Sequence, residues 1–242
     1  MSRTISLLAV SIPLLVACAS DDPAPGYTVQ VRGSLAQSAD LAAARSSHDG
    51  AAQGAEAQAR AGGDFAHHVL LGTAYAGTTA DEFLAIDQWR GELPDVQGFY
   101  ADPSFQAATA PLFSAPPSLR IYERREDWHS WGAAGGHTGP YWFLIVEGRL
   151  AQDGVEANRE AHDAVAAGFE AEANAAGDVA HLPHLAVDDP RAFFNIDAWS
   201  SEQGMLQTFA NPDFQREFLG LFEGPPTVRI YRSTDWHQWY AP

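Results

Sequence analysis

The sequence predicts an α+β protein in which two βαββαβ, ferredoxin-like repeats close one pseudo-dimeric α/β barrel within a single chain. The first observation behind this prediction is a tandem duplication, since residues 31–37 match residues 146–152 and an Asp-Trp-His-x-Trp motif occurs at both 127–131 and 235–239. Each copy is too long for a solenoid repeat of roughly 20–50 residues and is large enough for a small domain. The second observation is the order of elements within each copy. The third is the apolar character of both strand faces.

The second copy shows the order of elements most clearly. Residues 141–148 are rich in β-formers, whereas residues 156–176 lack proline and place apolar side chains at helical spacing before Gly177. Ser200 and Ser201 are suitable caps for a second helix, which is interrupted near Asn211-Pro212. We therefore expect the order βαββαβ over strand 141–148, helix 156–176, strand 180–187, strand 192–199, helix 200–221 and strand 227–231, and the same plan in the first copy.

The third strand of each copy predicts how the two sheets are covered. Side chains alternate along a strand, so Leu84 and Ile86 point to one face while Phe83, Asp87 and Trp89 point to the other. The second copy repeats this pattern with Phe194 and Ile196 on one face and with Phe193, Asp197 and Trp199 on the other. Helices can cover only one face of each sheet. We therefore expect the two sheets to pack against each other and close a barrel.

The copies divide the chain into segments. We expect a first repeat over residues 27–131, a Gly-rich linker over residues 132–140 and a second repeat over residues 141–242. Because each chain supplies both halves of the barrel, we expect a pseudo-dimer within one chain and a monomeric protein.

The N-terminus has the layout of a secretory signal, with Arg3 followed by an apolar run too short to span a bilayer. The small residues before Cys18 resemble a bacterial lipobox. This resemblance implies a signal peptide over residues 1–17, lipidation of Cys18, a tether over residues 18–26 and, with the uncharged Ala19, an outer-membrane location. The alternative is an unmodified buried cysteine. Cys18 is the sequence's only cysteine, so no internal disulfide is expected.

Charge excludes several classes of function. The formal net charge is −17, and every basic residue is an arginine. Nucleic-acid binding needs a cationic patch and is therefore not expected. The absence of lysine from the sequence also excludes Schiff-base chemistry and a P-loop phosphate site.

Each copy has a strand that ends in acid-x-Trp, followed by a helix broken at a proline and by a Pro-Pro step before the last strand. This pattern resembles the antibiotic-biosynthesis-monooxygenase group of dimeric α/β-barrel proteins. The residues that carry this resemblance are Asp87/Trp89, Asp197/Trp199, 102–105, 211–214 and the two Pro-Pro steps. It implies homodimer-like pairing and, in some members, oxidation of phenolic or quinol-like substrates by O₂ without an added cofactor. Many relatives carry a histidine in the second helix, near the position of Phe209 here.

A second, local resemblance concerns the first helix of each repeat. Arg45-x-x-His48 and Arg159-x-x-His162 look like the Arg-x-x-His of YciI-like proteins in the same barrel superfamily, in which the histidine pairs with an aspartate. It points to Arg45 and Arg159 as candidate substrate-binding residues and to both histidines as residues of interest.

The candidate catalytic residues are His48, His162, Asp87 and Asp197. Each histidine lies on the helix stripe that should face the sheet, where it is either a general base or a core histidine bonded to a neighbour. Each aspartate needs a partner because burying a lone carboxylate is costly. A His–Asp pair could remove a phenolic proton or act as a structural polar clamp.

The candidate binding residues are Trp89, Trp199, His67 and His181, together with the two helix arginines. His67 and His181 lie on the second strands, where they are candidate partners for the aspartates. With His68 and His184 nearby, a metal site can be considered, but the spacing matches no specific metal motif, so we expect none. The two Asp-Trp-His-x-Trp ends are expected to pack over the neighbouring copy or to form an aromatic ligand platform.

Two functional hypotheses follow. The first is a membrane-anchored, cofactor-independent monooxygenase or oxidase of a small aromatic or quinol-like substrate. The second is a lipoprotein that binds a small ligand or has a structural role without catalysis, because this fold hosts many activities. An open pocket at the histidines would favour the first, and a sealed barrel the second. Phe169 matches Ala55 and Asn195 matches Ala85, so the two repeats need not hold equal cavities.

Overall fold

The computed structural model describes residues 26–75, 77–132 and 141–240. The predicted signal peptide (1–17), Cys18, nearly all of the tether (18–26) and most of the linker (132–140) lie outside the described residues. The first repeat contains β1 (Gly26–Ser34), α1 (Leu41–Ala61), β2 (Asp64–Gly72), β3 (Glu82–Arg90), α2 (Leu93–Ala101), α3 (Pro103–Thr109), the 3₁₀ turn η1 (Ala110–Leu112), β4 (Ser118–Arg124) and β5 (Trp131–Gly132).

The second repeat has the same helices and strands in the same order, without a counterpart of η1 among its described residues. They are β6 (Trp142–Arg149), α4 (Val155–Ala176), β7 (Asp178–Ala186), β8 (Asp189–Trp199), α5 (Glu202–Ala210), α6 (Pro212–Leu219), β9 (Thr227–Ser233) and β10 (Trp239–Tyr240). The predicted second helix is therefore two helices, because the ring of Pro212 cannot continue the first one. Asn211 ends α5 and accepts the backbone N–H groups of Asp213 and Phe214 to begin α6.

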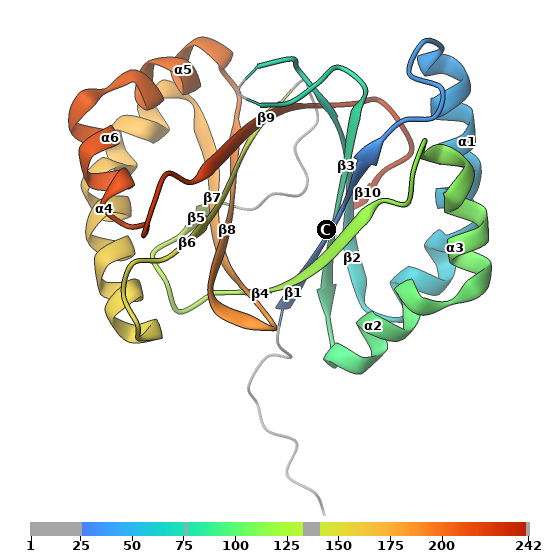
Figure 1. Ribbon diagram of the computed structural model, residues 1–242, viewed down its shortest axis with the longest axis horizontal. Helices are drawn as coiled ribbons and strands as arrows, with labels where there is room; N and C mark the ends of the chain where they lie inside the picture. The colour runs from blue at the N-terminus through green and yellow to red at the C-terminus, as the bar shows by residue number, and fades with distance from the viewer. Residues whose placement is uncertain (1–25, 76, 133–140, 241–242) are drawn as a thin grey trace, which may run out of the picture.

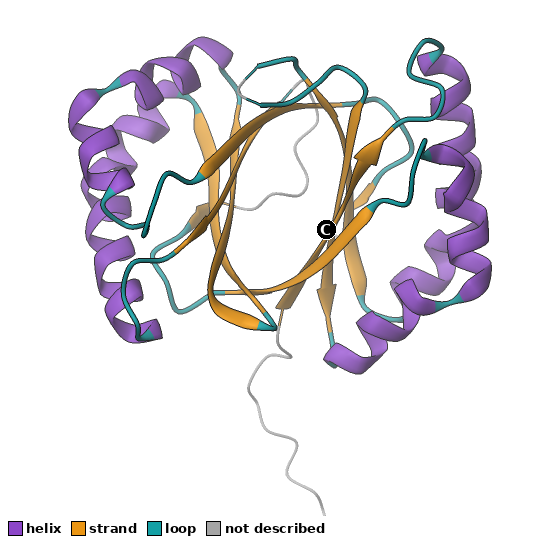
Figure 2. Cartoon of the chain, in the orientation of Figure 1, coloured by secondary structure: helices purple, strands orange, loops and turns teal. Residues whose placement is uncertain are grey.

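Eight of the described strands form one closed antiparallel barrel, in the order β2-β3-β1-β4-β7-β8-β6-β9. Two junctions join the repeats: β4 pairs with β7, and β9 pairs with β2 to close the circle. Helices α1–α3 cover the outside of the barrel at one repeat and α4–α6 cover it at the other (Figures 1 and 2). The prediction of a barrel closed within the chain is confirmed.

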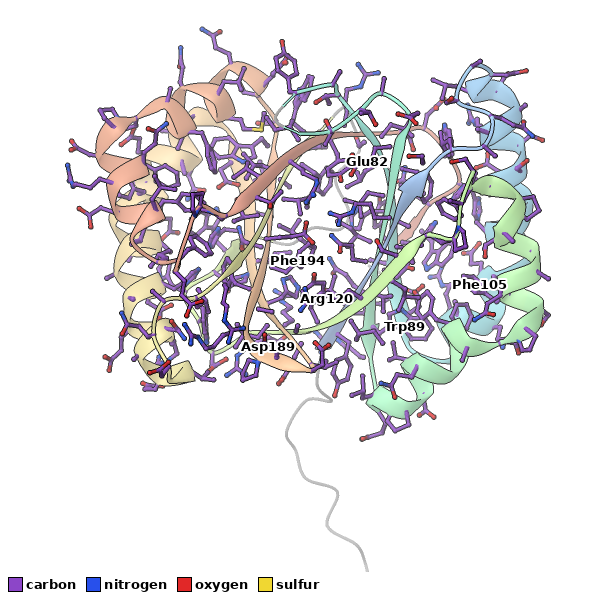
Figure 3. All side chains as sticks on the ribbon, in the orientation of Figure 1. Glu82, Trp89, Phe105, Arg120, Asp189 and Phe194 are labelled. Carbon is purple, nitrogen blue, oxygen red and sulfur yellow. The ribbon has the colours of Figure 1, made fainter. Side chains whose placement is uncertain are left out.

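The barrel interior is a packed core rather than a channel. Leu84 and Ile86 of β3 point into it and meet Phe194 and Ile196 of β8, as the alternation predicts. On the opposite face, Trp89 packs with the helices of its own repeat. Figure 3 shows Phe194 on the barrel side and Trp89 and Phe105 on the helix side. The space beneath the helices is therefore separate from the barrel interior.

The short strands β5 and β10 each cross to the other repeat. Trp131 of β5 pairs with His181 of β7, and Trp239 of β10 pairs with His67 of β2. Each Asp-Trp-His-x-Trp end thus packs over the neighbouring copy, as predicted. Within the described residues, none of the helices combines the length and apolar character needed to cross a membrane.

Candidate functional site

Four side chains from four elements meet beneath the helices of the first repeat. His48 of α1 faces His67 of β2 with 3.2 Å between their Nε2 atoms. Nδ1 of His67 is bonded to Oδ1 of Asp87, its neighbour across β2 and β3. The other oxygen of Asp87 accepts the hydroxyl of Tyr100 from α2. The sheet register and the two helices therefore assemble one continuous hydrogen-bonded cluster.

The outer end of this cluster lies on α1. Nδ1 of His48 is 3.0 Å from Oδ1 of Asp49, and that carboxylate also accepts the backbone N–H of His237 at 2.7 Å and Nε of Arg45 at 3.3 Å. Asp49, His48, His67 and Asp87 thus form a line from the protein surface to the sheet, which we call the first relay.

The C-terminal segment of the second repeat completes this site. The indole of Trp239 stacks on His67 with ring centroids 4.3 Å apart, and the ring of Trp236 lies 5.4 Å from that of His48. His237 also bonds Glu56 of α1 through Nε2 at 2.9 Å. A site built on the first repeat therefore depends on residues of the second.

Burial changes the acid–base properties of the site. Burial, and then the neighbouring His67, lower the pKa of His48 to about 4. Burial, and then the charge of Asp87, raise the pKa of Asp64 to about 9, although the backbone N–H of Ala66 opposes the change. Burial also raises the pKa of Tyr100 well above its ordinary value. Asp64 and Tyr100 are therefore neutral near pH 7.

The second repeat contains the same line of groups, which we call the second relay. Nδ1 of His162 is 3.0 Å from Asp163, its Nε2 is 3.1 Å from Nε2 of His181, and Nδ1 of His181 is 2.6 Å from Asp197. Trp131 stacks on His181 at 4.5 Å, as Trp239 does on His67. The duplication therefore preserved the whole relay.

The cavities beside the two relays differ greatly in size. The first repeat has a cavity of about 620 Å³, lined by His48, His67, Asp64, Asp87 and Tyr100 at its polar end. The corresponding space in the second repeat is about 60 Å³. Of these two cavities, the one beside the first relay has room for an organic ligand, and Trp239 of the second repeat completes its lining.

The difference in volume comes from substitutions at matched positions. Ala55 corresponds to Phe169, Ala51 to Val165, and Thr109 to Phe218. Phe169 and Phe218 both pack against Phe214 in the second repeat, with ring centroids 5.2 and 5.3 Å apart. Aromatic side chains therefore occupy the space that stays open in the first repeat.

The remaining predicted residues lie apart from the cavity. Arg45 bonds Asp49 and Asp235 near the surface, and Arg159 pairs with Glu156 and Asp163; neither arginine lines a cavity. The indole N–H of Trp89 donates to Tyr100 at 3.2 Å, and Trp199 lines the small second cavity. His184 bonds Thr28 at 2.8 Å, and His68 contacts Phe143 and Tyr240. Among the described residues, no group of three or more His, Cys, Asp or Glu side chains is arranged to hold a metal.

Sequence reasoning missed three residues of the site: Asp49, Asp64 and Tyr100. Tyr100 occupies the first-repeat position that corresponds to Phe209, so a polar group does reach the aspartate from the second helix in one repeat. Comparing the two copies at this helix would have shown a tyrosine against a phenylalanine. Asp64 and Asp178 also match between the copies, which was the available signal for that position.

Comparisons with known proteins support the fold. No protein-family model matches the sequence, and no curated protein matches it significantly. Solved structures do match. One is a monooxygenase candidate from Fusobacterium nucleatum, with a TM-score of 0.62 and 7% sequence identity over 90% of this chain and 95% of the other. Another is a monooxygenase candidate from Lactobacillus acidophilus, with a TM-score of 0.59 and 10% identity over 90% of this chain and 96% of the other. An anthrone oxidase-like protein also matches, with a TM-score of 0.58 and 17% identity over 90% of this chain and 94% of the other. The chain thus shares the fold of these solved structures over most of its length.

Proposed function

We propose that the first repeat binds a small, mainly apolar aromatic compound that carries a hydroxyl group, and that the protein oxidises this compound with O₂ without an added cofactor. The observation that carries the proposal is the cavity of about 620 Å³, whose lining is mostly apolar and whose acid–base groups lie together in one buried cluster. This volume lies within the range of about 300–1,000 Å³ that is usual for small-molecule sites. Two structural neighbours are named as monooxygenases, a class that also uses O₂ as its oxidant, although the reaction proposed here inserts no oxygen atom.

The charge of the cavity favours a neutral ligand. Its lining contains Asp64 and Asp87 but no arginine. An anionic ligand would therefore meet a carboxylate without a compensating arginine. A phenol or quinol is neutral when free and can donate its hydroxyl hydrogen to the histidine–aspartate cluster. The apolar remainder of the cavity suits the ring.

The proposed reaction needs only the substrate and O₂. In a quinol, both O–H bonds break and two electrons pass to O₂, giving a quinone and hydrogen peroxide. His67 is the general base for the first proton, and Asp87 orients its ring through Nδ1. Asp64 is kept neutral by burial and by Asp87, so its O–H can donate to an oxygen of the substrate. The substrate supplies both electrons.

The test is aerobic oxygen uptake by the full-length protein in detergent against a panel of quinols and polyphenols. His67→Gln should lower kcat by roughly 10²–10⁴-fold, as expected for loss of a general base, and Asp87→Asn should also lower kcat because it removes the group that orients His67. The matched control is Asp197→Asn, because Asp197 occupies the same position beside a cavity of only about 60 Å³. A folded wild-type protein that consumes no oxygen with any compound would contradict the proposal.

A second candidate function is binding without turnover. The observation in its favour is that Trp89, Tyr100, Asp87 and His67 already bond to one another without a ligand. A polar cluster satisfied in this way also serves as a structural clamp. Ligand binding measured by calorimetry, with no oxygen uptake, would support this function over the first.

We also propose that the protein acts from the cell envelope, anchored by lipid on Cys18 and placed in the outer membrane as a monomer. The support is the short apolar N-terminal segment followed by a single cysteine. Metabolic labelling with a palmitate analogue should mark the wild-type protein but not a Cys18→Ser variant. Equal labelling of the two proteins would contradict the anchor.

A further inference from the structure

The first relay contains three consecutive contacts between titratable groups: Asp49 to His48, His48 to His67, and His67 to Asp87. The two outer contacts join a ring Nδ1 to a carboxylate oxygen, and the central contact joins two Nε2 atoms 3.2 Å apart. The rings are nearly coplanar in orientation, with an interplanar angle of 4°. All three contacts have the geometry of hydrogen bonds, and each hydrogen bond needs one proton.

Counting protons shows that neutral groups cannot supply all three bonds. Two neutral imidazoles carry two ring protons, and two ionised carboxylates carry none. Wherever two protons are placed along the line, one of the three contacts is left with two facing lone pairs. The observed geometry therefore requires a third proton within the four residues.

The outer carboxylate does not hold this proton. Burial raises the pKa of Asp49, but the backbone N–H of His237 and the bonds from His48 and Arg45 outweigh it and keep the pKa below its ordinary value. Asp87 accepts the hydroxyl of Tyr100, and because an imidazole is ordinarily a stronger base than a carboxylate, the proton between Asp87 and His67 belongs to the ring. Both carboxylates are therefore acceptors, and the third proton lies with the two histidines.

Between the histidines, His67 is the better holder of the positive charge. The pKa of His48 is lowered to about 4 by burial and then by His67, so His48 is the neutral acceptor. His67 then donates from both ring nitrogens, to His48 and to Asp87, and its ring stacks on Trp239 at 4.3 Å. A cationic ring is stabilised by an aromatic face and by an adjacent carboxylate.

The surroundings contain further charges that act on the relay. Arg45 and Asp235 bond each other beside Asp49, and His237 bonds Glu56 on the same side. Asp64 shares the cavity end with Asp87. The second relay repeats all three contacts, at 3.0, 3.1 and 2.6 Å. The arrangement is thus a property of the repeat and not of one cavity.

We propose that each Asp-His-His-Asp relay stores one proton between its two histidines, and that in the first repeat Asp49 exchanges this proton with solvent. The second part rests on the proposed function. In the first repeat, release of the stored proton to solvent through Asp49 leaves His67 able to accept the first substrate hydroxyl proton, which it then passes to the reduced oxygen. The second substrate proton goes to the same oxygen species, and a proton from solvent refills the relay. The relay is then unchanged after each turnover, and the substrate O–H bonds and the new O–H bonds of peroxide balance.

The storage is tested by NMR of the ¹⁵N-histidine-labelled full-length protein in detergent. We expect one strongly deshielded, slowly exchanging proton coupled to a pair of Nε2 atoms in each relay, and Nδ1 protonated in all four histidines. Asp49→Asn should remove only the signal of the first relay, and Asp163→Asn only that of the second. Nε2 shifts typical of ordinary neutral tautomers, with no such proton at neutral pH, would overturn the proposal.

The exchange is tested by activity. Asp49→Asn should lower kcat about tenfold or more with little change in KM, and small diffusible imidazole buffers should restore part of the loss. Asp163→Asn should leave kcat unchanged. An unchanged kcat in Asp49→Asn would refute Asp49 as the outlet even if the NMR signal is present. If no substrate is oxidised at all, the NMR result still decides whether the proton is stored.

Discussion

Asp64 offers the sharpest prediction because its protonation state sets a large and measurable free energy. The carboxyl is buried at the polar end of the cavity, where burial and then Asp87 raise its pKa from 3.8 to about 9. Asp64→Asn keeps the shape of the side chain and a hydrogen-bond donor, but its amide does not ionise as pH rises. We therefore expect the variant to be more stable than the wild type near neutral pH.

The direction and size of the effect follow from linkage. A raised native pKa means that the native state binds the proton more tightly than the unfolded state. The contribution of Asp64 to the free energy of unfolding is therefore complete below pH 3.8 and declines as pH rises toward 9. Each pH unit in this window lowers the free energy of unfolding by about 1.4 kcal/mol, so the stability lost by pH 7 is about 4 kcal/mol. Between pH 5 and 7 the loss is about 2.7 kcal/mol, or roughly 5–10 °C in Tm for a chain of this size.

The assay is thermal unfolding of the wild type and Asp64→Asn from pH 4 to 8. The gap in Tm between them should widen as pH rises. Asp178→Asn should behave similarly, because burial and then Asp197 raise the pKa of Asp178 to about 9. The exposed Asp188 serves as the control, and its asparagine variant should show a constant gap. Parallel curves for wild type and Asp64→Asn would refute a neutral Asp64.

Three further substitutions follow from the comparison of the two repeats. Ala55→Phe copies Phe169 and should abolish ligand binding in the first cavity with the fold intact, as calorimetry and circular dichroism can show; retained binding would mean that the ligand lies elsewhere. Tyr100→Phe removes a donor to buried Asp87 and should cost about 1–3 kcal/mol in urea unfolding, whereas no loss would mean that Asp87 does not need this donor. Trp239→Ala should lower oxygen uptake while Trp131→Ala leaves it unchanged, and equal losses would contradict a single active repeat.

The fold was largely predictable because both repeats carry the same pattern of strands and helices. The alternation in residues 83–89 placed Leu84 and Ile86 on one face and Phe83 and Trp89 on the other, and the structure shows that the first face meets the barrel interior and the second the helices. The strands that begin at Asp178 and Asp189 start earlier than the predicted 180 and 192, whereas the break of the second helix at Pro212 was predicted. These differences are local, because the two hydrophobic faces determine how the layers pack.

The site was predictable only as separate residues. His48, His67 and Asp87 were each recognised, but a sequence cannot show that Nε2 of one histidine faces Nε2 of another, since that depends on the distance between α1 and β2. Tyr100 was missed because its partner lies on a strand and its polar end is visible only once α2 is placed. The choice of the open repeat depended on several side-chain volumes acting together, of which Ala55 and Phe169 were the visible pair.

A tandem chain can do what a symmetric homodimer cannot, and the barrel itself shows this. Arg32 and Glu147 occupy equivalent positions of the two repeats, yet Arg32 donates to Glu147 at 2.7 Å across the barrel. In a homodimer the same two positions would carry identical side chains, and two arginines or two glutamates would repel each other. The same freedom allows Phe169 to fill one repeat while Ala55 leaves the other open. Removing both charges, as Arg32→Met with Glu147→Gln, should therefore cost less stability than the sum of the two single changes, and additive losses would refute a direct interaction.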